Sequence, residues 1–103
     1  MEIAFMMKET GIKDKVIDEI IEIAKQNDIS KVILFGSRAR GDYRKKSDID
    51  LAVSGGNFYR FALDVDETTS TLLEYDFVNL DKGITKELQK SIDKDGVIIY
   101  EKI

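Results

Sequence analysis

Cysteine, histidine, tryptophan and proline are all absent from this chain of 103 residues. Without cysteine and histidine there can be no disulfide bonds, no thiolate or imidazole zinc sites, no haem or iron–sulfur ligation of the usual kinds, and no Ser-His-Asp or Cys-His triad. Any catalysis must depend on carboxylates, hydroxyls, Lys and Arg, backbone groups and bound hard cations. The absence of cysteine also fits a reducing compartment, and we expect a cytoplasmic protein.

Long hydrophobic runs are missing as well. The apolar run over residues 3–7 is too short for the hydrophobic region of a signal peptide, and the acidic Glu2 before it is the wrong flank, since a signal peptide begins with positive charge. No segment approaches the roughly 18 apolar residues of a membrane span, and we expect no membrane partner. With 43% hydrophobic and 35% charged residues, the sequence predicts a single domain over residues 1–103 with a densely charged surface.

The net charge of −4, from 16 Lys and Arg against 20 Asp and Glu, is unevenly distributed. Residues 36–46 contain one acidic residue, Asp42, and five basic residues: Arg38, Arg40, Arg44, Lys45 and Lys46. A solvated connection is the ordinary interpretation of such a segment. Because the rest of the chain is acidic, we expect no stable binding of nucleic acid, which favours a basic face.

Hydrophobic periodicity predicts alternating helices and strands. Apolar residues recur at helical spacing over 14–27, raggedly over 59–75, and from Ile84 to a helix end before Gly96. Short apolar or alternating runs predict strands at 31–35, 48–53, 75–80 and 97–100. The alternation predicts an α/β (α+β) fold, in which helices pack on a small mixed β-sheet.

The first chemical feature is Gly36-Ser37, directly after the strand predicted at 31–35. We expect one helical turn to follow before Gly41 ends it. Glycine lets a ligand approach the backbone closely, and the free N–H groups at a helix start attract phosphate. On its own, Gly-Ser at the end of a strand is most often only a turn.

Aspartates supply the other two features. Asp48 and Asp50 stand two residues apart in a predicted strand, so their side chains point to the same side. Such a pair is tolerated where that face is wet, or where a divalent cation lies between them, and Mg²⁺ commonly binds one or two carboxylates together with substrate phosphates. Asp76 lies in the otherwise apolar strand at 75–80, where an unpaired carboxylate is costly unless it faces water or an open site.

Together these features resemble the signature of minimal nucleotidyltransferase domains in the DNA polymerase β-like superfamily. That signature is G-S-x-A-R-G, then S-D-I-D-L, then an Asp on the next core strand. The chain has no departure from it: Gly36-Ser37-Arg38-Ala39-Arg40-Gly41, Ser47-Asp48-Ile49-Asp50-Leu51 and Asp76. The resemblance extends from the first predicted helix to the last strand, and it implies the nucleotidyltransferase fold.

The resemblance implies roles for these residues. Asp48, Asp50 and Asp76 would be the catalytic residues and would hold two Mg²⁺ ions. Asp76 would also be the best available proton acceptor, since the chain has no histidine. ATP would be the substrate, bound by Gly36, Ser37, Arg38, Arg40 and Ser47, with Lys45 or Lys46 offsetting its charge.

The resemblance also implies a partner. Minimal members resemble the antitoxin of a two-gene toxin–antitoxin pair, whose toxin is a small HEPN-type ribonuclease. The family implies transfer of AMP from ATP to a tyrosine hydroxyl of that toxin, and 103 residues leave no room for the additional acceptor-binding domain of larger relatives. The alternative is a catalytically silent antitoxin that keeps the fold and neutralises its partner by occlusion.

Other nucleotide-binding motifs fail to match. Gly36 and Gly41 have the spacing of a P-loop, but Asp42 stands where that motif requires lysine. The Rossmann glycine pattern is absent. Apolar side chains for docking a partner are expected at Ile3, Phe5, Met6 and Met7, or at Phe58 and Phe61, unless these residues pack in the core, as Met and Phe stripes more often do.

Overall fold

The computed structural model, which describes residues 9–103, is built on a four-stranded sheet in the order β3-β2-β1-β4. β1 (Lys31–Phe35) and β2 (Ile49–Ser54) form its centre, and β3 (Tyr75–Asn79) and β4 (Val97–Glu101) form its edges. β1 is antiparallel to both β2 and β4, whereas β2 and β3 are parallel. The sheet is therefore mixed, as the sequence predicts.

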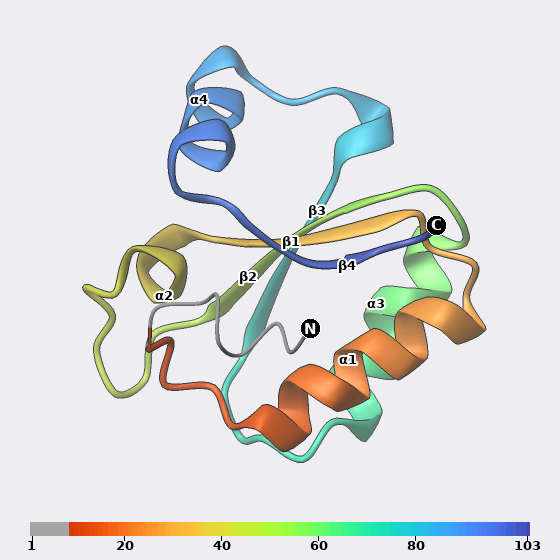
Figure 1. The fold of residues 1–103 in the computed structure, drawn as a ribbon, viewed down its shortest axis with the longest axis horizontal. Coiled ribbons are helices and arrows are strands. Elements are labelled where there is room, and N and C mark those ends of the chain that lie inside the picture. Colours follow the sequence, from red (N-terminus) through yellow and green to blue (C-terminus); the bar gives the residue numbers. More distant parts are fainter. Residues whose placement is uncertain (1–8) are drawn as a thin grey trace.

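Helices lie on both sides of this sheet (Figure 1). α1 (Asp14–Gln26) and α3 (Phe58–Thr68) run side by side on one face. α2 (Gly36–Arg40) directly follows β1, and α4 (Lys86–Asp95) lies on the face opposite α1. α3 provides the crossover that the parallel pairing of β2 with β3 requires. Among residues 9–103, no helix combines the length and the apolar character needed to cross a membrane.

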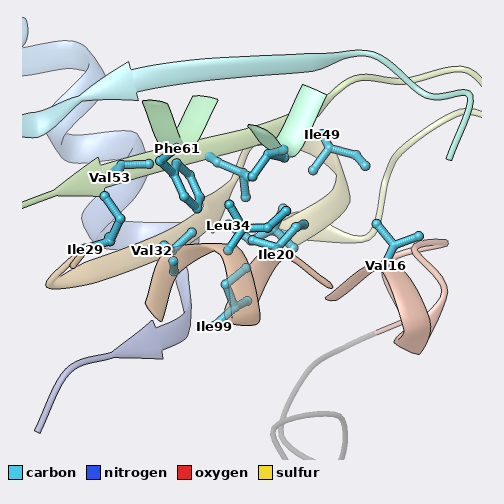
Figure 2. Packing of buried hydrophobic residues seen from close by; sticks show 14 residues of the cluster. Val16, Ile20, Ile29, Val32, Leu34, Ile49, Val53, Phe61 and Ile99 are labelled. Atoms are coloured by element: carbon cyan, nitrogen blue, oxygen red, sulfur yellow. The ribbon is translucent and has the colours of Figure 1, made fainter. Parts of the chain in front are cut away.

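The main core lies between the sheet and the helices α1 and α3, and Figure 2 shows its side chains interlocking. Ile20 of α1, Leu34 of β1 and Phe61 of α3 are completely buried there. Burial of an apolar side chain of this size stabilises the fold by about 1.5–3 kcal/mol. Because side chains alternate along a strand, the core residues of β2 leave the remaining β2 side chains on the opposite face.

That opposite face carries a smaller apolar cluster. Its buried members are Phe35, Ala52 and Ile92, from β1, β2 and α4. Val78 of β3 and Leu88 of α4 are only partly buried against it. The α4 side of the sheet is therefore less completely covered than the α1 side, and it is here that polar β2 side chains have room.

The third predicted helix, over 59–75, is wrong at its C-terminal end, because α3 stops at Thr68. The hydroxyls of Thr68 and Thr69 donate to the carbonyl oxygens of Asp64 and Val65, at 2.6 and 2.7 Å. Thr69 itself has an extended backbone. Threonine hydroxyls compete in this way for the carbonyls that would continue a helix, so the threonine-rich segment leaves the helix.

The end of β3 also differs from the prediction. The strand stops at Asn79, and a short 3-10 helix, η2 (Leu80–Lys82), follows. The side chain of Asn79 accepts a hydrogen bond from the Asp81 amide, at 3.0 Å, which starts the 3-10 turn at Leu80, the last residue of the predicted strand.

Phe61 is completely buried and Phe58 packs against the same core. The expectation that these two residues form a docking surface is therefore wrong, and the core alternative is confirmed. The other expected docking residues, Ile3, Phe5, Met6 and Met7, lie outside the described residues.

Candidate active site

The sheet topology places two carboxylates side by side. Asp50 of β2 is the register partner of Asp76 in the parallel ladder with β3, and neighbouring strands lie about 4.8 Å apart. On its other side, Asp50 is the register partner of Phe35, the last residue of β1. Because Ile49 and Leu51 face the main core, Asp50 points to the α4 side of the sheet. The strands of Asp50 and Asp76 are thus neighbours, so the two carboxylates could share one cation site.

Asp48 is the third predicted carboxylate, and it lies one residue before β2 with an exposed side chain. Its negative charge is close enough to raise the pKa of Asp50. Among residues 9–103, no three acidic side chains are already gathered closely enough to hold a metal ion together. Asp48 must therefore be drawn toward Asp50 and Asp76 if all three are to share a cation.

The surroundings of Asp50 oppose its negative charge. Burial of the carboxyl group raises its pKa most, and the charges of Asp76 and Asp48 raise it further, to about 6. The positive charges of Arg40 and Arg38 offset only part of this rise. Divalent cations would neutralise this concentration of carboxylates, and Mg²⁺ can complete its coordination with water and substrate phosphates. The donor set therefore fits Mg²⁺.

Gly36 brings the backbone after β1 against Asp50. Its φ of 74° lies in the left-handed region, which glycine tolerates best. A Cβ atom at this position would overlap Asp50 Oδ2. Glycine thus lets β1 turn directly into α2 beside the carboxylate. The Gly36 turn therefore lies in direct contact with Asp50. The family resemblance implies that the turn holds the triphosphate and that Asp50 holds cations.

The helical turn expected after Gly36 is confirmed as α2. It ends at Gly41, whose φ of 93° is left-handed and whose amide donates to the Ser37 carbonyl oxygen at 2.9 Å. Ser37, in the first turn, is half-buried. The side chain of Ser47 caps the next turn, because its hydroxyl accepts a hydrogen bond from the Arg44 amide at 2.8 Å.

The basic residues of the segment differ sharply in environment. Arg40 is exposed, and its Nε atom lies 3.2 Å from Oδ2 of Asp42 in a surface ion pair. The side chains of Lys45 and Lys46 are exposed as well. Such groups can turn toward a bound anion at small cost, because surface ion pairs contribute little to stability.

Arg38 has the opposite environment, with only 1% of its surface exposed. Its guanidinium donates to the carbonyl oxygens of Thr10, Ser47 and Lys45, at 2.8, 2.9 and 3.3 Å. Arg38 and Arg40 are both basic residues of one charged segment, and no signal in the sequence distinguishes their environments. The nucleotide-binding roles of Arg38, Arg40 and Ser47 stay predictions.

Comparison with known proteins identifies the family. The family described as "Polymerase beta, Nucleotidyltransferase" matches residues 18–103. A protein of Methanocaldococcus jannaschii, named "Putative protein adenylyltransferase MJ0604", is 31% identical over 100 residues, which cover 85% of this chain and 98% of that protein.

Solved structures share the fold. A toxin–antitoxin structure with AMP-PNP has a TM-score of 0.67 and 21% identity, and the match covers 84% of this chain and 73% of that one. A structure of the toxin–antitoxin MntA-HepT has a TM-score of 0.63 and 18% identity, with coverage of 87% and 74%. The family match spans both β2 and β3, so the aspartates of the sheet lie within it. The chain belongs to the polymerase β-type nucleotidyltransferases.

Proposed function

We propose that this protein transfers AMP from ATP to a tyrosine hydroxyl group of a HEPN-type toxin, and that it acts as an antitoxin. The observation that carries the proposal is the pairing of Asp50 with Asp76 beside the Gly36 turn. The carboxylates that would attract cations thus lie next to the turn that would bind phosphate. The similarity to a protein named as an adenylyltransferase supports AMP as the transferred group.

The residues divide between cation and nucleotide. Asp48, Asp50 and Asp76 would hold two Mg²⁺ ions, which when bound stabilise the charge on the attacking and leaving oxygens of an in-line displacement. Gly36 and Ser37 would hold the triphosphate. We assign the offset of phosphate charge to Arg40 rather than to Arg38, because Arg40 is exposed and in a surface pair while Arg38 is buried.

In the proposed reaction, the acceptor oxygen forms a bond to the α-phosphorus of ATP. The bond between that phosphorus and the bridging oxygen of the β-phosphate breaks, and pyrophosphate leaves. The proton of the acceptor hydroxyl passes to the exposed carboxylate of Asp76, which can approach the acceptor from solvent. The products are an AMP ester of the acceptor and pyrophosphate.

The partner assignment draws on the two solved structures described above, both of which are toxin–antitoxin structures and one of which contains AMP-PNP. A toxin of this kind would present its acceptor hydroxyl to the end of the sheet where Asp76 is exposed. Modification of that hydroxyl would then neutralise the toxin by adding a bulky, negatively charged group.

The test is incubation of the protein with the product of its neighbouring gene, Mg²⁺ and ATP labelled in its α-phosphate. We expect label on the partner from the wild type, none from Asp48→Asn, and wild-type labelling from Asp18→Asn. Asp18 is a matched control because it is an exposed aspartate on α1, away from the sheet. Equal labelling by Asp48→Asn and wild type would overturn the proposed chemistry. Neutralisation of the toxin by an unlabelled, Asp48→Asn protein would instead favour occlusion.

A further inference from the structure

Arg38 is a buried charge that the proposed reaction does not use. Arginine is almost never fully buried unless its charge is compensated, and this side chain is 1% exposed. Its partners among residues 9–103 are backbone carbonyl oxygens and an aromatic ring. A buried guanidinium that donates to three backbone carbonyl oxygens restrains the backbone conformation of the segments that carry them.

The three hydrogen bonds join two separate segments. Nε and Nη2 donate to Ser47 and Lys45, in the connection between α2 and β2, while Nη1 donates to Thr10, before α1. The guanidinium is a rigid planar fork, so fixing one of its donors fixes the direction of the others. The connection that leads to β2 is therefore held at two carbonyls and tied to the segment before α1.

One face and one edge of the guanidinium are also covered. The Tyr43 ring lies over it, with the guanidinium carbon 4.7 Å from the ring centroid. Gly11 closes the edge, because a Cβ atom there would lie 2.7 Å from Arg38 Nη1. Residues from the segment before α1 and from the connection between α2 and β2 thus enclose the arginine.

The bond to Ser47 bears directly on Asp48. The Ser47 carbonyl and the Asp48 amide belong to one planar peptide unit. The hydrogen bond from Arg38 Nε to that carbonyl therefore fixes the orientation of the peptide that precedes the Asp48 Cα atom. On the other side, the Ile49 amide donates to the Glu74 carbonyl oxygen at 2.9 Å, which begins the pairing with β3. Asp48 is thus fixed by its backbone on both sides.

We propose that Arg38 is a positioning residue whose guanidinium holds the Ser47–Asp48 peptide so that Asp48 can join Asp50 and Asp76 around a divalent cation. The inference rests on the proposed function, because it assigns Asp48 to the cation. It explains why an arginine, rather than a lysine, occupies this position: an ammonium group has no planar fork with which to reach three carbonyls in fixed directions.

The first test measures Mn²⁺ binding to the full chain by calorimetry. Arg38→Lys keeps the charge but loses the fork, and we expect about 10- to 100-fold weaker binding, the usual effect of removing groups that orient metal ligands. Arg60→Lys is the matched control, since Arg60 is exposed in a surface ion pair with Asp64, and it should bind as the wild type does. Equal affinity of Arg38→Lys and wild type overturns the inference.

The second test needs no metal. Arg44, Lys45 and Lys46 are trypsin sites within the connection that Arg38 holds. We expect faster cleavage after these residues in Arg38→Lys than in wild type, with unchanged cleavage after Lys25 in α1 and Lys90 in α4. Faster cleavage at all sites equally would show a global loss of stability and would overturn a positioning role, as would an unchanged rate in the connection.

A second variant guards against an unfolded Arg38→Lys protein. Tyr43→Ala keeps the arginine but removes the ring over it, and we expect both weaker Mn²⁺ binding and faster cleavage in the connection. Wild-type behaviour of Tyr43→Ala in both measurements, with Arg38→Lys unfolded, overturns the inference. Failure of the wild type itself to bind Mn²⁺ contradicts the proposed function, whereas wild-type binding with unaffected variants contradicts only the role of Arg38.

Discussion

At the scale of the residue, Asp50 shows how the site differs from the rest of the fold. Its carboxyl group is half-buried, and its pKa is raised to about 6, most by burial and then by the negative charges of Asp76 and Asp48. In the absence of cations, its ionised form destabilises the native state. Stability given up in this way is common where a site is organised for a ligand that supplies the missing charge.

Asp50→Asn should therefore stabilise the metal-free protein while abolishing transfer. The folded pKa of Asp50 lies above its ordinary value of 3.8, so the folded protein loses stability as pH rises from about 4 to about 6. The asparagine variant avoids this loss. After allowance for the screening of a half-exposed group, we expect a gain of about 1 kcal/mol at pH 7, equivalent to roughly 4–8 °C in Tm.

Thermal unfolding without divalent cations at pH 7 and again near pH 4 measures this effect. The gain should be present at neutral pH and largely lost near pH 4, where wild-type Asp50 is protonated. A variant that is less stable than wild type at pH 7 would show that the ionised carboxylate is stabilising, in conflict with its surroundings.

Gly36 gives a second prediction at this scale, with Gly41 as its matched control. Both have left-handed backbones, with φ of 74° and 93°, but a Cβ would overlap Asp50 at Gly36 and meet nothing within 4 Å at Gly41. Gly41→Ala should cost only the backbone term, about 1–2 kcal/mol. Gly36→Ala should cost more and also displace Asp50.

Urea denaturation of the two variants, together with Mn²⁺ binding, separates the backbone term from the contact. Gly36→Ala should be the less stable and should bind Mn²⁺ more weakly than Gly41→Ala. Equal stability and equal Mn²⁺ binding of the two variants would show that the close approach of Gly36 to Asp50 affects neither stability nor cation binding, and would contradict the prediction.

At the scale of the element, the start of β3 is anchored by α1. Glu19 of α1 accepts hydrogen bonds from the amide and the hydroxyl of Ser70, both at 2.8 Å, in the segment between α3 and β3. These bonds lower the pKa of Glu19, the amide bond most. The path of the chain into β3, and so the place of Asp76, depends in part on this contact.

Glu19→Ala should loosen that segment without affecting the core. Hydrogen exchange at the Ser70 amide should become faster, whereas exchange in β1 should not change. Because the folded pKa is below the ordinary 4.5, the contact stabilises the protein above about pH 4.5 and is lost as pH falls through the lowered value. Glu22→Ala, an exposed glutamate of the same helix, is the control. Unchanged exchange at the Ser70 amide would show that the Glu19 contact does not restrain this segment.

The elements themselves follow closely from local pattern. All four strands and the helices at α1, α2 and α4 lie where periodicity and glycine positions predict them. The prediction failed where hydrogen bonds outside the pattern decide the structure: Thr68 and Thr69 end α3, and Asn79 starts η2. Periodicity depends only on which side chains are apolar, so it cannot predict where side-chain hydrogen bonds compete for backbone carbonyl groups.

At the scale of the whole molecule, the site depends on sheet order. The spacing of Asp48 and Asp50 is visible in the sequence, but only the parallel pairing of β2 with β3 shows that Asp76 is the neighbour of Asp50. The difference between Arg38 and Arg40 is likewise a property of the fold, because the carbonyl partner of Arg38 at Thr10 is 28 residues away. Local residue types predicted the candidate chemistry; long-range contacts decide which residues face it and which support it.

The uneven charge also acquires a structural meaning at this scale. The basic segment between β1 and β2 begins at Gly36, whose backbone lies against Asp50 of β2. It includes the exposed Arg40 and the buried Arg38, and both positive charges act to lower the pKa of Asp50. Positive charge next to a carboxylate cluster suits a ligand that joins anionic phosphates to divalent cations. A nucleoside triphosphate with Mg²⁺ has that composition.

The most direct measurement compares two forms of labelled ATP in the presence of Mg²⁺ and the product of the neighbouring gene, one labelled in the α-phosphate and one in the γ-phosphate. The account predicts that only the α-label becomes attached to the partner, with release of pyrophosphate, and that Asp76→Asn abolishes the attachment. Attachment of the γ-label would show phosphoryl transfer instead, and attachment of neither label by a protein that binds ATP and Mg²⁺ would contradict the account.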